Sequence, residues 1–199
     1  MSERVFNLLA SVTVLSWAAS IARAQLLDPA ASWSPWIVVL LHAVVGVLFL
    51  VRRPVVRSGS FASALASAPS VIVAGFAVTP GANAATWSPH AEAVFVLGGA
   101  VAIAALLSLG RSFAVLPAVR VVVDRGLYRF VRHPVYLGEG LMLIGCMLAT
   151  PGLQAVGVCA AAAVLLVVRV WVEERGLAQD AVYVDYCRRV RWRWLPGVR

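Results

Sequence analysis

The segment Val135–Val172, VYLGEGLMLIGCMLATPGLQAVGVCAAAAVLLVVRVWV, decides the fold. It contains two apolar runs, Val135–Thr150 and Leu153–Val172, which are separated by the dipeptide Pro151–Gly152. A Pro-Gly pair between two apolar runs is a strong turn signal. An apolar run of about 20 residues can cross a bilayer as a helix. The segment therefore predicts a hairpin of two membrane-spanning helices, the first of which is short.

Four further apolar runs precede this hairpin, at Val5–Ala22, Pro35–Val51, Phe61–Val78 and Glu92–Leu109. Hydrophobic residues make up 61% of the 199 residues and charged residues only 13%, a balance far too apolar for a typical soluble domain. We therefore predict an all-α, polytopic transmembrane bundle of about six helices. The segment Ala22–Ala24 resembles a signal-peptidase site; we favour an uncleaved first helix, and cleavage would leave five.

The basic residues indicate how the chain lies in the membrane. All 17 are arginine, and the net charge is +8. Such a charge can indicate nucleic-acid binding, but these arginines stand mostly between apolar runs, which is typical of positive-inside topology. Arg4, Arg52 and Arg53 fall on the same side as the later arginine-rich segments, and Arg23 falls on the opposite side. We expect both termini in the cytoplasm, no nucleic-acid partner and, since lysine is absent from a short chain, a bacterial inner membrane.

Cysteine and histidine give no sign of a metal site. The three cysteines and three histidines form no CxxC motif and no Cys/His pairing, so we expect neither bound zinc nor a disulfide framework. His42 lies in an apolar run, and only His133 stands in a recognisable motif.

Two polar strips border the hairpin: the first polar strip is Gly110–Gly138 and the second is Arg169–Pro196. In the first, Gly126 favours a turn, and Pro134 disfavours a helical conformation at the preceding residue and can open the next helix. This pattern gathers Arg132, His133 and Tyr136 at the mouth of the fifth span. Such residues can form part of a site, or can simply anchor a helix in the interface.

The second polar strip places an ionisable residue inside the membrane end of the sixth span. Arg169, Glu173 and Leu177 are four residues apart and therefore share a helix face. A buried arginine at this depth usually faces a cavity or a partner, and Glu173 can be that partner. The alternative is a structural ion pair with a snorkelling arginine. Glu139, just inside the fifth span, can pair with an arginine or cap a polar cavity.

Three motifs in these strips resemble a known family. They are GLYRFVRHPVYLG at Gly126–Gly138, EERGL at Glu173–Leu177 and YVDYCRRVRWRWLP at Tyr183–Pro196. Together, over Leu109–Pro196, they resemble the isoprenylcysteine carboxyl methyltransferase family, which belongs with the membrane phospholipid methyltransferases. The apolar runs place three N-terminal spans in residues 1–91, and the resemblance implies a methyltransferase core in residues 92–199, with cytosolic C-terminal segments that bind the cofactor.

The resemblance also implies an S-adenosylmethionine site without a Rossmann fold, in a cytosolic pocket beside a tunnel that opens to lipid. The implied cofactor-binding residues are Arg120, Val121, Val122, Val123, Tyr128, His133, Tyr136, Glu173 and Glu174. The implied catalytic residues are Arg169, Tyr136, Arg132 and Arg193. In these roles Glu173 would bind the cofactor's ammonium group, Arg169 would orient a substrate carboxylate, and Arg193 would close the site.

The choice of acceptor rests on proton chemistry. A carboxylate needs no general base at neutral pH, whereas an amine must first lose a proton. Because the sequence shows no obvious catalytic base pair, we predict carboxyl O-methylation of an isoprenoid or another lipophilic or lipid-anchored substrate. The alternatives are N-methylation of a phospholipid head group, for which Gly98 and Gly99 form no GxG signature, and a non-catalytic membrane scaffold.

Overall fold

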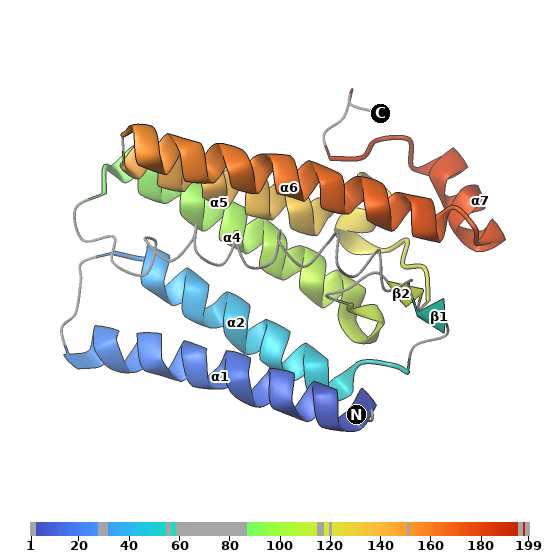
Figure 1. The fold of residues 1–199 in the computed structure, drawn as a ribbon, viewed down its shortest axis with the longest axis horizontal. Helices are drawn as coiled ribbons and strands as arrows, with labels where there is room; N and C mark the ends of the chain where they lie inside the picture. The colour runs from blue at the N-terminus through green and yellow to red at the C-terminus, as the bar shows by residue number, and fades with distance from the viewer. Residues whose placement is uncertain are drawn as a thin grey trace.

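The computed structural model describes residues 3–27, 32–54, 57–58, 87–114, 118–119, 121–150, 152–194 and 197. Their long helices are α1 (Glu3–Leu27), α2 (Ser34–Val51), α4 (Pro89–Leu109), α5 (Pro134–Ala149) and α6 (Leu153–Leu177). These helices lie side by side as a bundle, and a short helix, α7 (Ala181–Arg189), lies at one end of it (Figure 1). The predicted all-α helical bundle is confirmed. The predicted span at residues 61–78 lies outside the described residues.

The helices have the length and composition of membrane spans. Within the part of the chain that the structure describes, four segments are long and apolar enough to cross a bilayer: Glu3–Leu27, Ser34–Val51, Pro89–Ser112 and Ala155–Leu177. The shorter helix α5 is also apolar. The chain is therefore an integral membrane protein. The exposed leucines and valines along its outer helices would contact the lipid acyl chains.

The last long helix extends past its apolar run. That run was predicted to end at Val172, but α6 continues to Leu177, as the shared helix face of Arg169, Glu173 and Leu177 implied, and α7 follows it after a short turn. The helix continues because the segment Glu173–Leu177 holds good helix formers and no proline. The side chain of Asp180 then caps α7 by accepting a hydrogen bond from the backbone amide of Val182 at 2.8 Å.

Local residue chemistry also sets the other helix ends. Ser88 caps α4 by accepting a hydrogen bond from the backbone amide of Ala91 at 3.3 Å. The short 3-10 helix η2 (Gly110–Ser112) follows α4, where Gly110 has a φ of 53°. Pro134 opens α5, as the sequence predicted.

Helices α4 and α5 pack so closely that their backbones are in contact. A Cβ atom on Gly98 would lie 2.7 Å from the Gly138 carbonyl oxygen, and one on Gly138 would lie 2.6 Å from the backbone nitrogen of Ala102. About two turns further along α5, a Cβ atom on Gly145 would lie 2.8 Å from the backbone nitrogen of Phe95. Small residues allow this approach, which maximises contact between helices within a membrane.

Helices α1 and α2 attach to this pair through side chains. Leu15 of α1 lies over Gly46, and the Ser11 hydroxyl donates to the Gly46 carbonyl at 2.9 Å. On the other side of α2, Ile37 packs against Gly99 of α4. The two N-terminal helices therefore form a second layer against the α4–α5 pair (Figure 1).

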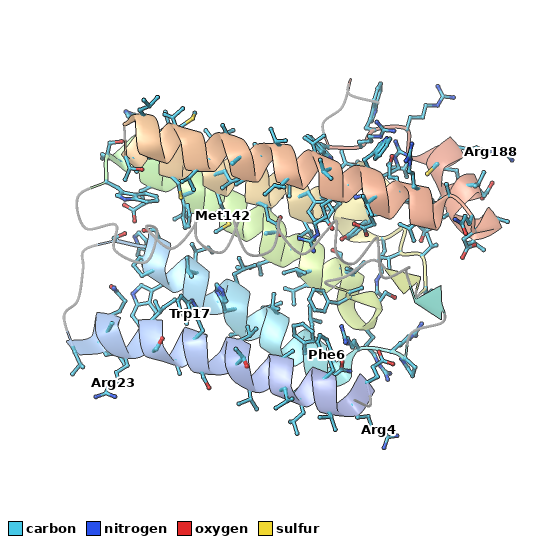
Figure 2. All side chains as sticks on the ribbon, in the orientation of Figure 1. Arg4, Phe6, Trp17, Arg23, Met142 and Arg188 are labelled. Carbon is cyan, nitrogen blue, oxygen red and sulfur yellow. The ribbon has the colours of Figure 1, made fainter. Side chains whose placement is uncertain are left out.

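The C-terminal ends of α2 and α4 meet at the end of the bundle where α5 begins and α6 ends (Figure 1). The backbone amide of Arg53 donates to the carbonyl of Arg111 at 2.8 Å. Beyond it, β1 (Arg57–Ser58) pairs in antiparallel fashion with β2 (Ala118–Val119). Figure 2 shows Arg4 and Arg188 toward this end and Arg23 toward the other. We call this the arginine-rich end; it has the sidedness that the arginine pattern predicted.

Candidate functional site

The two polar strips lie against each other at the arginine-rich end. The backbone amide of Arg132 donates to the carbonyl of Trp192 at 2.9 Å, and that of His133 donates to the carbonyl of Arg193 at 2.9 Å. The 3-10 helix η3 (Gly126–Arg129) turns the chain toward this pairing, and Gly126 has a φ of 58° there, as expected of a turn. The two strips, which both border the α5–α6 hairpin, therefore meet over one end of it.

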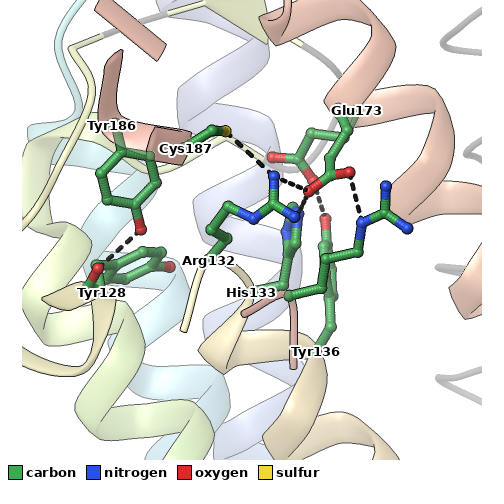
Figure 3. A network of polar contacts seen from close by, with 9 residues as sticks. Tyr128, Arg132, His133, Tyr136, Glu173, Tyr186 and Cys187 are labelled. Carbon is green, nitrogen blue, oxygen red and sulfur yellow. Dashed lines mark hydrogen bonds and ion pairs between the residues drawn. The ribbon is translucent and has the colours of Figure 1, made fainter. Parts of the chain in front are cut away.

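A single carboxylate ties the strips together through side chains. One oxygen of Glu174, Oε1, lies 3.0 Å from Arg132 Nη1 and 3.2 Å from His133 Nε2. The other oxygen, Oε2, lies 2.8 Å from Arg193 Nε. Arg132 Nη1 also donates to Cys187 Sγ at 3.1 Å (Figure 3). We call Arg132, His133, Glu174 and Arg193 the clamp, because they join the first polar strip, α6 and the second polar strip.

The neighbouring residue Glu173 faces a different group. The Tyr136 hydroxyl donates to Glu173 Oε2 at 2.6 Å (Figure 3). The Tyr136 ring stacks on the His133 ring with centroids 5.6 Å apart, and the Arg169 guanidinium lies 5.0 Å from the Tyr136 ring centroid. A cation over an aromatic face is a favourable contact. Tyr136 is thus the central member of a row that runs from His133 to Arg169.

This row forms one wall of a cavity of about 540 Å³. Drug-sized ligands and cofactors occupy cavities of about 300–1,000 Å³. Away from the row the wall is mostly apolar and comes from α1, α2, α4, α5 and α6. Its large apolar residues include Val14, Leu41, Phe49, Leu106, Leu143 and Leu166. The cavity therefore has a polar part at the arginine-rich end and an apolar part deeper in the bundle.

Helix α7 covers the side of the cavity formed by η3. The Tyr186 hydroxyl donates to the backbone carbonyl of Tyr128 at 2.8 Å. Burial raises the pKa of Tyr128 and that of Tyr186 well above the usual value of a phenol. Both phenols are therefore neutral at physiological pH. Tyr186 forms a buried cluster with Tyr183 and Val190, and Val122 and Leu177, the last residue of α6, pack against it.

Most of the predicted site residues converge on this cavity. Those that line it are Val121, Val122, Val123, Tyr128, Arg132, His133, Tyr136, Arg169 and Glu173. Glu174 and Arg193 meet in the clamp rather than in the lining of the cavity. Arg120 lies outside the described residues.

Several lining residues were not assigned from the sequence. Tyr183 and Tyr186 stand in a quoted motif, and their three-residue spacing on a helix would have placed them on one face. His42 and Glu139 were visible as ionisable residues in membrane spans, which is a signal of function. Contributions from α1, such as Thr13, carry no signal in the sequence, because they depend on how the helices pack.

The arrangement suits recognition of a charged small molecule beside an apolar chain. Glu173 offers a carboxylate to a cation, Arg169 offers a guanidinium to an anion, and both lie next to the aromatic ring of Tyr136. The apolar part of the same cavity can hold a hydrocarbon group. Among the described residues, no group of three or more histidine, cysteine, aspartate or glutamate side chains could hold a metal ion.

Residues 91–179 match the model of the isoprenylcysteine carboxyl methyltransferase (ICMT) family. The match spans α4, α5 and α6 and so includes His133, Tyr136, Arg169 and both glutamates of the EERGL motif. Comparisons with curated proteins and with solved structures give no match. The resemblance deduced from the motifs is confirmed, since these residues are similar to the ICMT family of membrane methyltransferases.

Proposed function

From this ICMT-like core, we propose that the protein uses S-adenosylmethionine to methylate the carboxyl group of an isoprenoid or another lipophilic substrate in the membrane. The observation that carries the proposal is the cavity. It joins Tyr128, His133, Tyr136, Arg169 and Glu173 at one end and an apolar wall at the other. A charged cofactor and a lipophilic acceptor can meet only where such polar and apolar parts are continuous.

The polar part of the cavity fits the cofactor's functional groups. S-adenosylmethionine supplies a methyl group on a positively charged sulfur, and it also carries an ammonium and a carboxylate. Glu173 is proposed to bind the ammonium, since a carboxylate forms strong charge-assisted hydrogen bonds with such a group. The Tyr136 hydroxyl, 2.6 Å from Glu173 Oε2, orients that carboxylate. Residues 121–123 and Tyr128 form the adjoining wall of the cofactor pocket.

The proposed acceptor site lies on the Arg169 side of Tyr136. Arg169 lies on α6, one helical turn deeper than Glu173. A guanidinium there can hold the acceptor carboxylate in line with the reacting methyl group, while Tyr136 and His133 exclude water from the polar part. Methyl transfer is a displacement in which opposite charges are neutralised, so positioning and exclusion of water supply much of the rate.

The proposal includes an orientation. We infer that the arginine-rich end faces the cytoplasm of a bacterial cell, where the cofactor is made, and that both termini lie on that side. The grouping of Arg4 and Arg188 at one end, with Arg23 at the other, supports this orientation through the positive-inside rule (Figure 2).

Two substitutions test the assigned roles. Glu173→Gln removes one charge-assisted contact and should weaken binding of S-adenosylhomocysteine by about 10- to 100-fold. Arg169→Ala should leave the affinity for S-adenosylhomocysteine nearly unchanged. It should reduce the rate of labelled-methyl transfer into a lipid extract by at least about 10- to 100-fold. The measurements are a calorimetric titration and an initial-rate assay in the same detergent.

The outcomes separate the alternatives. If the wild-type protein shows no detectable binding of S-adenosylhomocysteine, the enzymatic proposal is refuted in favour of a scaffold. Mild base releases a label carried as a carboxyl ester but not one carried on an amine, so a base-stable product would point to N-methylation instead. Equal loss of cofactor affinity in both variants would reassign Arg169 to the cofactor.

A further inference from the structure

Glu139 stands out as a carboxyl group inside the α5 span. It lies on α5, one helical turn beyond Tyr136, and its side chain lines the cavity. Its Oε2 atom is buried and accepts no hydrogen bond from the residues that the structure describes. A buried carboxylate oxygen without a donor is unfavourable. In a membrane span such a group usually serves a substrate or a proton.

The charges around Glu139 come from several helices. On α5 it follows Tyr136, from α6 come Arg169 and Glu173, and from α2 comes His42, all of which line the same cavity. Arg132 also reaches the wall, and its Nη1 lies 3.0 Å from Glu174 Oε1 in the clamp. Glu139 and Glu173 thus bring two carboxyl groups to the wall beside the guanidinium of Arg169.

The apolar wall of the cavity constrains the acceptor. An acceptor that passed these apolar residues as an anion would carry a charge without a partner there, and an uncompensated charge in such surroundings is expensive. An acceptor that arrives uncharged avoids this cost.

We propose that Glu139 is the proton acceptor of the reaction, and that the substrate is a lipophilic carboxylic acid that enters from the membrane in its uncharged form. This inference rests on the proposed function. The acid transfers its proton to the Glu139 carboxylate and becomes the carboxylate nucleophile beside Arg169. One of its oxygens then forms a bond to the methyl carbon as the bond from that carbon to sulfur breaks, and the bonding pair stays on the neutral thioether sulfur. The ester leaves uncharged, and Glu139 returns its proton to water.

Glu139→Gln tests this role, because glutamine keeps the size of the side chain and cannot accept the proton. Labelled-methyl transfer from S-adenosylmethionine into a lipid extract should fall about 10²- to 10⁴-fold, the usual contribution of a general base. In the wild-type protein kcat/KM should fall toward acid pH as Glu139 becomes protonated, and the variant should lose that dependence. A transfer rate equal to or above the wild-type rate, or a base-stable product, would overturn the inference.

Two controls isolate the carboxylate. Glu139→Asp keeps a proton acceptor, so it should retain the acid limb of the pH profile at a reduced rate. Asp185→Asn removes an exposed carboxylate from α7 and should leave the rate at the wild-type value. Affinity of Glu139→Gln for S-adenosylhomocysteine should stay within about twofold of wild type. If the wild-type protein transfers methyl groups and only the Glu139 expectations fail, the proposed function stands and this inference falls.

Discussion

The cavity wall and the clamp meet at two adjacent residues of α6, and the comparison between them separates catalysis from assembly. Glu173 belongs to the cavity wall. Among the described residues, the hydroxyl of Tyr136 is the one group that donates a hydrogen bond to its side chain. Glu174 belongs to the clamp, where both of its oxygens lie within 3.2 Å of basic nitrogen atoms. One carboxylate thus keeps binding capacity for a ligand, whereas the other is saturated by the protein itself.

The difference follows from helix geometry. Successive residues on an α-helix point about 100° apart, since 3.6 residues make one turn. Glu173 therefore shares the cavity face with Arg169, while Glu174 turns toward Arg132 and Arg193 (Figure 3). A pair of identical residues in a motif can in this way serve two functions that mutation can separate.

Breaking the clamp should give the largest effect on stability. Glu174→Ala would leave Arg132, His133 and Arg193 without their shared carboxylate. Removing one partner of a buried ion pair is strongly destabilising, and about 3 kcal/mol is expected here because Arg193 is 42% exposed. Thermal unfolding in detergent micelles and trypsin cleavage after the arginines of residues 188–193 measure the loss.

Glu174→Ala should also lose affinity for S-adenosylhomocysteine, because the second polar strip would no longer lie over the cavity. Glu173→Gln serves as the matched control, since it should lose affinity while unfolding at nearly the wild-type temperature. Wild-type stability and protease resistance in Glu174→Ala would show that the clamp does not hold the strip.

Sequence patterns predicted the parts of the site that depend on local chemistry. The succession of α5 and α6, the opening of α5 at Pro134 and the shared face of Arg169 and Glu173 all follow from properties of neighbouring residues. Helix periodicity thus placed Arg169 and Glu173 on the same side of α6. The sixth span was placed at Leu153–Val172 because the apolar run ends there, whereas α6 continues to Leu177.

Long-range packing could not be predicted in the same way. The backbone contact between Gly98 and Gly138 decides how closely α4 and α5 approach, yet each glycine alone gives no register. The entry of His42 and Thr13 into the cavity depends on that packing and on the position of α1 and α2. The pairing of residues 132–133 with 192–193 joins backbone groups, which carry no residue-specific signal.

A smaller effect is expected from a change confined to the cavity wall. Tyr136→Phe removes the hydroxyl that donates to Glu173 but keeps the ring that stacks on His133 and lies under Arg169. Affinity for S-adenosylhomocysteine should fall about tenfold, which corresponds to about 1.4 kcal/mol. Tyr136→Leu, which also removes the ring, should lose more. Equal affinities for Tyr136→Phe and the wild-type protein in a calorimetric titration would mean that Glu173 needs no orientation by Tyr136.

The smallest effect should come from an ion pair that resembles the clamp in chemistry but not in burial. Arg189 Nη1 lies 2.9 Å from Asp124 Oδ2, and it joins the second polar strip to the first as the clamp does. The hydrogen bond from Arg189 holds the pKa of Asp124 below its usual value, so the pair favours folding above that value and loses its effect as the pH falls. Both side chains are more than half exposed, and water and salt screen such pairs. Arg189→Ala should therefore leave the unfolding temperature at neutral pH indistinguishable from that of the wild-type protein. If Arg189→Ala lowered the unfolding temperature as much as Glu174→Ala does, charge pairing itself, rather than burial, would hold the two strips together.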